Sequence, residues 1–394
     1  MIVIRNISEL ITNDPSLGDG PLGIIGNAAI AFDDTVRWVG RSEEAPTDAV
    51  VIDARERAVI PGFVDSHAHL VFAGERSQEF AARMSGLPYV AGGIRTTVSA
   101  TRAATDAELA ANLERLSEEF LRSGVTHFEC KTGYGLTVHD EMRALDIAAR
   151  FTDDVTLLAA HVVPPEFAHA PQDYVDLIIS RMLPAAMGRA RWVDVFCDRG
   201  AFDVDQTRRI LSAAQRMGFQ LRLHANQLGF GPALDLAVEF DCASADHCTH
   251  LSERQVLKLA SSRTVATLLP GAEFSTRSAY PSARRLIDAG VTVALATDLN
   301  PGSSYTSSMP FCIAVAVRDM GFTPSEAVWS ATAGGAAALR RSDVGRLAPG
   351  ARADIVLLDA PNHLHLAYRP GVQLVSEVWR SGVHLLHEGN LHHA

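Results

Sequence analysis

The side chains best suited to chemistry in this sequence are histidines and one aspartate that end short apolar segments. His67 and His69 are separated by one alanine, and alternate residues of an extended chain point the same way, so both imidazoles can face one point. His224 and Asp298 end two further apolar segments. Three imidazoles and one carboxylate suit zinc or iron, which can lower the pKa of a bound water toward neutrality. We therefore predict that these four residues hold one divalent metal per chain, Zn²⁺ or iron.

The pattern His-x-His is a weak signal when it stands alone, because a histidine in a strand is more often a hydrogen-bonded core residue than a ligand. Its combination with His224 and Asp298 at the ends of other strands favours the metal site. Asp298 could bind the metal through one carboxylate oxygen and accept a proton from the attacking water with the other. We predict that Asp298 is the general base.

His247 closes another strand-like segment, Ser244-Ala245-Asp246-His247. We predict a catalytic role for it, on the attacking water or on the oxyanion that develops during the reaction. The sequence leaves two alternatives open, namely an additional metal ligand or a histidine that only supports the ligands.

Lys131 raises the alternative of a carbamylated lysine that bridges two metals. It ends the second strand-like segment, whereas the fourth, residues 192–196, contains no lysine. The absence of a lysine from the fourth segment favours a site with one metal over a site with two. We expect Lys131 to form an ion pair with Glu129, which lies two residues away on the same strand face.

Apolar segments alternate with amphipathic segments between residues 57 and 340, as expected for repeated βα units around a parallel sheet. The predicted strands are 62–67, 125–131, 156–162, 192–196, 220–224, 243–247, 264–269 and 291–297, and the predicted helices include 106–122, 141–151, 205–217, 231–240, 253–260 and 279–289. Eight units predict an α/β fold, a (β/α)₈ TIM-like barrel. Active sites of such barrels lie at the C-terminal strand ends. The polar residues at these ends are His67, Lys131, His161, His224, His247 and Asp298.

Both ends of the chain contain short β-rich pieces separated by turn residues. The predicted strands are 1–7, 28–32, 35–39 and 49–52 near the start, and 353–358, 373–380 and 383–386 near the end. We expect residues 1–56 and 341–394 to pair into a small β-sandwich domain, and residues 57–340 to form the barrel. The length of 394 residues fits a barrel of about 250 residues with an accessory domain.

Composition and charge exclude some classes of binding partner. The formal net charge is −11 and there is no basic run, so the chain lacks the electrostatic footprint of a nucleic-acid-binding protein. No apolar run approaches the ~20 residues that span a bilayer, and no secretory signal is visible. We expect a cytoplasmic protein that acts on a small molecule. Its five cysteines lack the spacing Cys-x-x-Cys, so we expect buried, reduced thiols.

Several longer motifs point to one family. The run from His67 to Phe80, HAHLVFAGERSQEF, is followed by Lys131-Thr-Gly-Tyr134-Gly-Leu, Ala160-His161-Val-Val-Pro-Pro-Glu, the block ending at His247, and Thr297-Asp298-Leu-Asn300-Pro-Gly302-Ser303. In this order they resemble the imidazolonepropionases, amidohydrolases of histidine breakdown. The closing block from Gly345 to Asp354 resembles amidohydrolases more broadly.

The resemblance implies a reaction and a set of site residues. The family opens 4-imidazolone-5-propanoate with water to give N-formimidoyl-L-glutamate, and a homodimer is expected. Arginine suits the propionate of this substrate because its planar fork can pair both carboxylate oxygens. Gln227 is implied as a catalytic residue that contacts the ring. The residues implied to bind substrate or product are Arg76, Tyr134, His161, Gln227, Asn300, Gly302 and Ser303.

Two departures from the family pattern concern loops near the substrate. The segment 86–94 is several residues shorter than usual, and Ala225-Asn226-Gln227 stands where an acidic residue often precedes the glutamine. Two other functions are also open. An amino-heterocycle deaminase would share the barrel and the ligands, but such enzymes typically carry a glutamate at the position of Gln227, which cannot shuttle protons in that way. A non-catalytic barrel scaffold would not need the intact set of histidines and Asp298.

Overall fold

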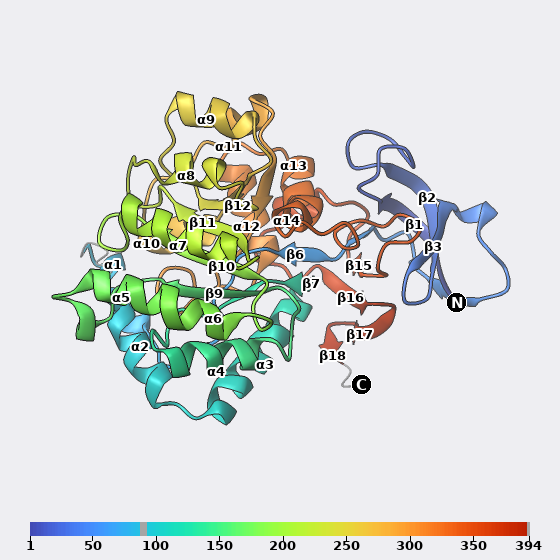
Figure 1. Cartoon of the computed structure of the whole chain (residues 1–394). Helices are drawn as coiled ribbons and strands as arrows, with labels where there is room; N and C mark the ends of the chain where they lie inside the picture. Colours follow the sequence, from blue (N-terminus) through green and yellow to red (C-terminus); the bar gives the residue numbers. More distant parts are fainter. Residues whose placement is uncertain (87–92, 392–394) are drawn as a thin grey trace. The chain divides into compact units, whose positions relative to one another are not determined.

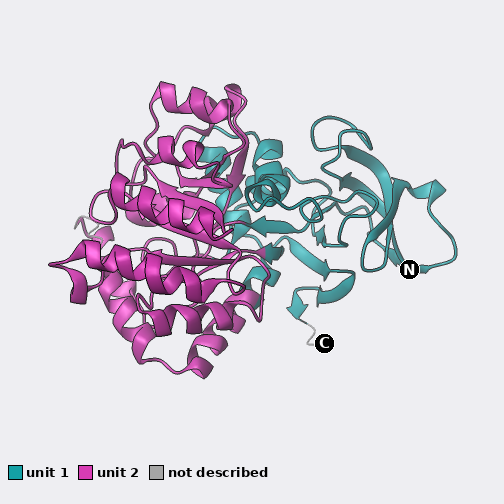
Figure 2. Cartoon of the chain, in the orientation of Figure 1, with its two compact units in different colours: residues 1–65, 118–127, 307–394 teal, residues 66–117, 128–306 magenta. Residues whose placement is uncertain are grey.

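A computed structural model describes residues 1–86 and 93–391 of the chain. The segment 86–94, predicted to be shortened, falls largely outside the described residues. The chain divides into two compact units (Figure 2): one consists of Met1–Asp65, Glu118–His127 and Ser307–Ala394, and the other of Ser66–Ser117 and Phe128–Thr306. We call them the terminal unit and the barrel unit.

A parallel sheet forms the centre of the barrel unit (Figure 1), and its strands follow one another in chain order. Within the described residues these strands are β8 (Cys130–Lys131), β9 (Val155–Ala160), β10 (Trp192–Cys197), β11 (Gln220–Ala225), β12 (Ser244–His247), β13 (Val265–Leu268) and β14 (Val293–Leu295). Their residues are buried almost throughout, as is usual for parallel strands covered on both faces.

The segment that carries the His-x-His motif closes this sheet into a barrel. The backbone N–H of His69 donates to the carbonyl of Leu299 at 2.9 Å, and the N–H of Asp298 donates to the carbonyl of His67 at 3.0 Å. On the other side, the N–H of Lys131 donates to the carbonyl of Ala68 at 2.9 Å. Residues 67–69 therefore bond to the chain next to both edges of the sheet, which brings the first and last strand ends together.

The first two predicted barrel strands are shorter than expected. They appear as β6 (Phe63–Asp65) and β7 (Val125–Phe128), which form a two-stranded sheet. The predicted strand 125–131 is divided at Glu129 into β7 and β8. Glu129 is completely buried, and its carboxylate accepts bonds from Lys131 and from the backbone of Ala68.

Helices connect the strands where the amphipathic segments predict them. The bounds of α3 (Asp106–Arg122) and α9 (Glu253–Ala260) match the prediction, and those of α4 (Val138–Ala148), α7 (Val204–Arg216) and α8 (Ala233–Glu239) differ by one to three residues. Two of these helices, α7 and α9, begin with a capping box, which is a local signal for a helix start. The other helices of the unit are α1 (Ser77–Met84), α2 (Ile94–Ala103), α5 (Pro171–Leu177), α6 (Leu183–Ala186), α10 (Pro270–Thr276) and α11 (Ala283–Asp288). The α/β barrel predicted from the sequence is confirmed.

The two ends of the chain pair in one sheet of the terminal unit, as predicted. Its strands are β1 (Ile2–Ile11), β2 (Ile24–Phe32), β3 (Val36–Arg41), β4 (Val50–Asp53), β5 (Val59–Pro61), β15 (Ile355–Leu358), β16 (Val375–Arg380), β17 (Val383–His387) and β18 (Asn390–Leu391). The order is β18-β17-β16-β15-β5-β1-β2-β3, with β4 beside β1. Phe32 and Trp379 lie on strands far apart in this order, yet their ring centroids are 6.1 Å apart. The sheet therefore folds over on itself around a shared core.

The terminal unit is larger than the domain predicted from the sequence. It also contains α12 (Met309–Asp319), α13 (Pro324–Trp329) and α14 (Gly335–Ala338). The domain boundaries at residues 56 and 341 stay a prediction. The five cysteines are buried thiols outside any disulfide, as expected. No helix in the described part of the chain is long and apolar enough to cross a membrane.

Candidate active site

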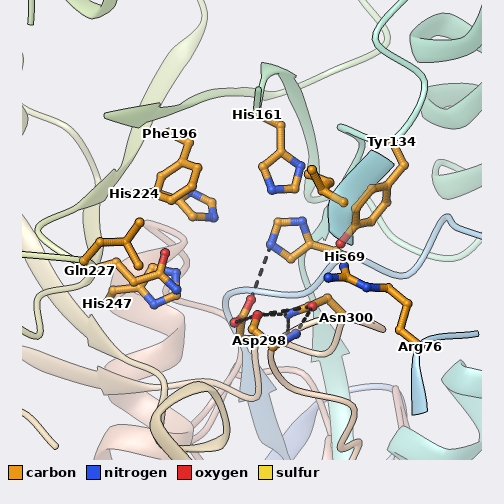
Figure 3. A pocket seen from close by; sticks show the side chains of 13 residues that line it. His69, Arg76, Tyr134, His161, Phe196, His224, Gln227, His247, Asp298 and Asn300 are labelled. Carbon is orange, nitrogen blue, oxygen red and sulfur yellow. Dashed lines mark hydrogen bonds and ion pairs between the residues drawn. The ribbon is translucent and has the colours of Figure 1, made fainter. Parts of the chain in front are cut away.

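A cavity of about 50 Å³ opens at the C-terminal ends of the barrel strands. Figure 3 shows histidines, Asp298 and Arg76 pointing toward one another around it. The lining includes most of the residues that the sequence singled out, contributed by segments far apart in the chain. They are His69, Arg76, Tyr134, His161, His224, Gln227, His247, Asp298, Asn300 and Ser303, together with Ile94, Phe196 and Leu228.

The four predicted metal ligands come together in this structure. The Nε2 atoms of His67 and His69 lie 3.3 Å apart, and Oδ1 of Asp298 lies 3.5 Å and 3.4 Å from them. Nitrogen atoms of His67, His69 and His224 all lie within 4.8 Å of one another. Ligand atoms at about 2.0–2.1 Å from a tetrahedral metal are separated by about 3.3 Å, so these spacings suit a shared cation.

Buried carboxylates lie close to the outer nitrogens of two of these imidazoles. Nδ1 of His67 lies 2.7 Å from Oδ2 of Asp246, and Nδ1 of His224 lies 3.0 Å from Oδ2 of Asp194. A carboxylate on the outer nitrogen fixes the ring and leaves the other nitrogen for a metal. This donor set therefore fits a divalent metal.

Protonation also suits metal binding. Burial lowers the pKa of His69 to about 3, so its imidazole is neutral near pH 7. Burial alone would raise the pKa of Asp298, but hydrogen bonding with His67 and His69 holds that pKa well below its usual value. Burial and Lys131 would lower the pKa of His67, but Asp246 and Asp298 outweigh them and raise it, so a metal bound at His67 would displace a proton. A neutral imidazole beside an ionised carboxylate is the form that binds a metal.

Lys131 joins the carboxylates behind the cluster. Its Nζ donates to Oε1 of Glu129 and to Oδ2 of Asp194, both at 2.8 Å, and lies 3.8 Å from Oδ2 of Asp246. The expected ion pair with Glu129 is present, and the contact with Asp194 is additional. Burial would lower the pKa of Lys131, but Asp194 and Glu129 raise it above its ordinary value. The side chain is therefore an ammonium group, and only the neutral amine forms a carbamate.

Sequence reasoning missed the residues of this buried network other than Lys131 and Glu129. Arg222 donates to the carbonyl of Ser66 at 2.6 Å, and its Nη2 lies 3.4 Å from Asp246. The available signal was a charged residue inside an otherwise apolar strand, as at Asp194 and Arg222, because such residues are rarely buried without partners.

His247 lies beside the cluster at the end of β12. Its ring centroid is 5.3 Å from that of His224 and 5.7 Å from that of His67. Burial lowers its pKa to about 3, so His247 is neutral near pH 7. One ligand atom of His247 lies within 4.8 Å of those of His67 and Asp298. The side chain is therefore close enough to act on a group bound beside Asp298.

Another buried acid, which the sequence did not single out, follows β13. Glu273 in α10 is buried, and its Oε1 accepts a hydrogen bond from Oγ1 of Thr249 at 2.7 Å. Burial raises the pKa of Glu273 to about 8. This carboxyl group is therefore largely protonated near pH 7.

Arg76 lies on the cavity wall with its guanidinium group buried. Its Nη2 and Nε pair with the carboxylate of Glu79 at 2.7 Å and 3.1 Å. The backbone of Gly302 lies against it, because a Cβ atom at that position would be 2.2 Å from Nη1 of Arg76. Gly302 thus leaves the space that the guanidinium group occupies.

The side chain of Asn300 stabilises the loop after β14 through hydrogen bonds to its backbone. Oδ1 of Asn300 accepts bonds from the backbone N–H groups of Gly302 and Ser303, both at 2.8 Å. Its Nδ2 donates to the carbonyl of Asp298 at 2.6 Å. Asn300 therefore ties the loop to the residue that also faces the histidine cluster.

Tyr134 and His161 also line the cavity. The rings of His161 and His69 stack with centroids 5.4 Å apart, and the centroids of His161 and Tyr134 are also 5.4 Å apart. Nδ1 of His161 donates to the carbonyl of Gly133 at 3.0 Å. Burial lowers the pKa of His161 well below its usual value, so its Nε2 is an acceptor. Gln227 reaches the same cavity from the loop after β11.

Comparisons with known proteins agree with this architecture. A model of the amidohydrolase family matches residues 58–384. The imidazolonepropionase of Streptomyces griseus is 66% identical over 381 residues, which cover 96% of this chain and 98% of that protein. The imidazolonepropionase of Mycolicibacterium smegmatis is 64% identical over 382 residues, covering 97% and 96%.

Solved structures with this fold include two zinc-bound enzymes. A mutant of atrazine chlorohydrolase from Arthrobacter aurescens, complexed with zinc and atraton, has a TM-score of 0.77 at 17% identity and covers 99% of this chain and 96% of its own. An adenosine deaminase from Xanthomonas campestris with bound zinc has a TM-score of 0.73 at 18% identity, covering 99% and 94%. At such low identity these likenesses show the fold alone.

The barrel, its histidine and aspartate cluster and the family match define the class of protein: the chain belongs to the amidohydrolases. Nearly full-length identity of 64–66% places it, within that class, in the imidazolonepropionase family.

Proposed function

We propose that this protein hydrolyses the cyclic amide of 4-imidazolone-5-propanoate to give N-formimidoyl-L-glutamate. The observation that carries the proposal is a buried arginine, Arg76, that lines the same cavity as His69, His224 and Asp298 of the histidine and aspartate cluster. A small acidic ring compound needs both features, one to bind its carboxylate and one to attack its ring. The names of the relatives support the same substrate.

His67, His69, His224 and Asp298 would hold one divalent metal per chain, Zn²⁺ or iron. When bound, such a metal lowers the pKa of a water ligand and polarises a carbonyl group. The remaining chemistry belongs to the side chains.

Asp298 has an oxygen for each of two tasks. Its Oδ1 faces both imidazoles of the His-x-His motif, whereas its Oδ2 lies 3.4 Å from Oγ of Ser303 on the cavity side. Oδ2 would accept the proton of the attacking water and pass it to the ring nitrogen as the C–N bond breaks. The low pKa of Asp298 keeps this oxygen ionised.

His247 would donate a hydrogen bond to the carbonyl oxygen as negative charge develops there. A neutral imidazole has one N–H donor, and burial keeps His247 neutral. A donor already positioned in a buried site stabilises such an oxyanion without reorganisation.

The other lining residues would position the substrate. Arg76 would bind the propionate, sharing its guanidinium group between the substrate and Glu79. Tyr134 and His161 would also contact the substrate, and Gln227 would contact the ring. The loop residues Asn300, Gly302 and Ser303 would border the carboxylate that the reaction forms.

A deaminase mechanism is disfavoured by one residue. Gln227 reaches the cavity where a proton-shuttling glutamate would be needed, and an amide cannot carry that proton. The cytoplasmic location and the homodimer expected from the sequence also stay proposals.

The decisive experiment follows the loss of imidazolone absorbance with purified protein, with and without a chelator, and identifies the product. We expect N-formimidoyl-L-glutamate, loss of activity with the chelator, and recovery when metal is returned. Release of ammonia from amino-heterocycles without turnover of the imidazolone would overturn the proposal in favour of a deaminase. Absence of both activities in metal-loaded protein would favour a scaffold.

A further inference from the structure

A second group of metal-ligating side chains lies in the terminal unit, on the hairpin of β16 and β17. Glu377 is on β16, and His384 and His387 are on β17. One potential ligand atom from each of the three lies within 4.8 Å of the other two. The catalytic proposal uses none of them.

The spacing in this group matches ligands around a shared cation. Oε2 of Glu377 lies 3.3 Å from Nε2 of His384 and 3.5 Å from Nδ1 of His387. Charge-assisted hydrogen bonds between nitrogen and a carboxylate are shorter, about 2.7–2.9 Å. Nitrogen and oxygen ligands of a tetrahedral zinc ion are separated by about 3.3 Å, given metal bonds of about 2.0–2.1 Å.

Two of the three side chains, those of His384 and Glu377, are held in place by neighbouring residues. The ring of His384 stacks on Trp379 with centroids 4.4 Å apart and an angle of 11° between planes. The other oxygen of Glu377, Oε1, lies 3.3 Å from Nη2 of Arg57. These contacts hold the imidazole plane and leave Oε2 directed at the histidines, so little side-chain entropy would be lost on binding an ion.

The surroundings also suit an ion that exchanges with solvent. The side chain of Glu377 is 7% exposed, that of His384 is 31% exposed and that of His387 is 49% exposed. The group therefore has a buried anionic side and an open side where water could complete the coordination.

We propose that Glu377, His384 and His387 form a second metal site, for a divalent transition metal of the zinc class. Two imidazoles and one carboxylate favour ions of this class. Calcium and magnesium are disfavoured because they take oxygen ligands. The bound ion would join β16 to β17 and stabilise the terminal unit. This inference is independent of the proposed hydrolysis.

The test measures zinc stoichiometry and cobalt absorption with untagged, full-length protein freed of metal by a chelator. We expect two ions per chain in the wild type. We expect one ion in His387→Gln and in Glu377→Gln, with hydrolysis unchanged, and loss of the other ion in His224→Ala. His139→Gln, which changes a side chain that is 82% exposed, is the matched control and should keep both ions.

Thermal unfolding gives a second readout that does not depend on catalysis. The second equivalent of zinc should raise the melting temperature of the wild type and of His139→Gln but not of His387→Gln. A wild type that binds one ion, or a His387→Gln variant that binds two, would overturn the proposal. So would loss of the second ion in the double variant His392→Gln/His393→Gln, because the ion would then depend on the end of the chain.

Discussion

Asp246 Oδ2 lies 2.7 Å from Nδ1 of His67, and both side chains are completely buried. The contact fixes the imidazole so that its other nitrogen faces His69 and Asp298. The cationic side chains of Arg222 and Lys131 lie close to Asp246 and keep its carboxylate ionised. The geometry of the proposed metal site therefore depends on residues that never face the cavity.

The first prediction concerns this support. Asp246→Asn keeps the shape of the side chain but removes its charge. His67 therefore loses a carboxylate that orients its ring and that makes the ring more basic. We expect metal affinity to fall by about 10–100-fold, as for other partners of ligating histidines. Competition with a chromophoric chelator measures this. Unchanged affinity would mean that Asp246 serves the fold rather than the metal.

The second prediction separates ligands from catalytic groups. His224→Ala should lose its metal and its activity together, because one of four ligands is removed. His247→Ala should keep its metal and lose turnover. Metal analysis and kcat measured on the same preparations distinguish the two. If His247→Ala loses its metal as completely as His224→Ala, His247 is a ligand.

The third prediction concerns substrate selection by Arg76. Arg76→Met should chiefly impair use of the charged substrate and leave metal content normal. Breaking a buried charge pair on one side costs about 3–5 kcal/mol, so kcat/KM should fall by roughly two to four decades. The control is an imidazolone that lacks the acid group. Equal losses for both substrates would show that Arg76 supports the fold or the metal ligands.

The fourth prediction rests on the space that Gly302 leaves. The added methyl group of Gly302→Ala would lie 2.2 Å from Nη1 of Arg76, so the guanidinium group must move. We expect a higher KM for the propionate substrate with normal metal content. Gly231→Ala is a matched control, because a Cβ atom there meets no atom within 4 Å. Equal kinetics in the two variants would contradict the close approach of Gly302 to Arg76.

The fifth prediction is a pH dependence of stability from Glu273. Burial raises its folded pKa from 4.5 to about 8, so the folded state holds a proton that the unfolded state has released between these values. This contribution to stability is complete below the unfolded pKa and is lost as the pH rises through about 8.

Urea unfolding over this pH range tests the fifth prediction. Glu273→Gln cannot ionise, so its free energy of unfolding should fall less between pH 4.5 and pH 8 than that of the wild type. Identical slopes would mean that Glu273 ionises as easily in the folded protein as in the unfolded chain.

The sequence alone determined which elements form and where the reactive side chains lie along them. His67, His224 and His247 could be placed at strand ends because apolar runs and turns mark the strands. Helices such as α9 were predicted to the residue because their caps are local. The prediction was less accurate for β1, whose end was placed at Ile7. The strand continues past an irregularity near Asn6 and ends at Ile11.

Only the tertiary structure decided which side chains meet. Asp194 lies on β10, and its approach to His224 on β11 depends on the register of these parallel strands. Asp246 on β12 meets His67 because the segment 67–69 closes the barrel. A strand buried on both faces has no alternation of polar and apolar residues, so its sequence does not specify that register. The close approach of Gly302 to Arg76 and the grouping of Glu377 with His384 likewise arise from packing, because side-chain direction depends on neighbours that the local sequence does not contain.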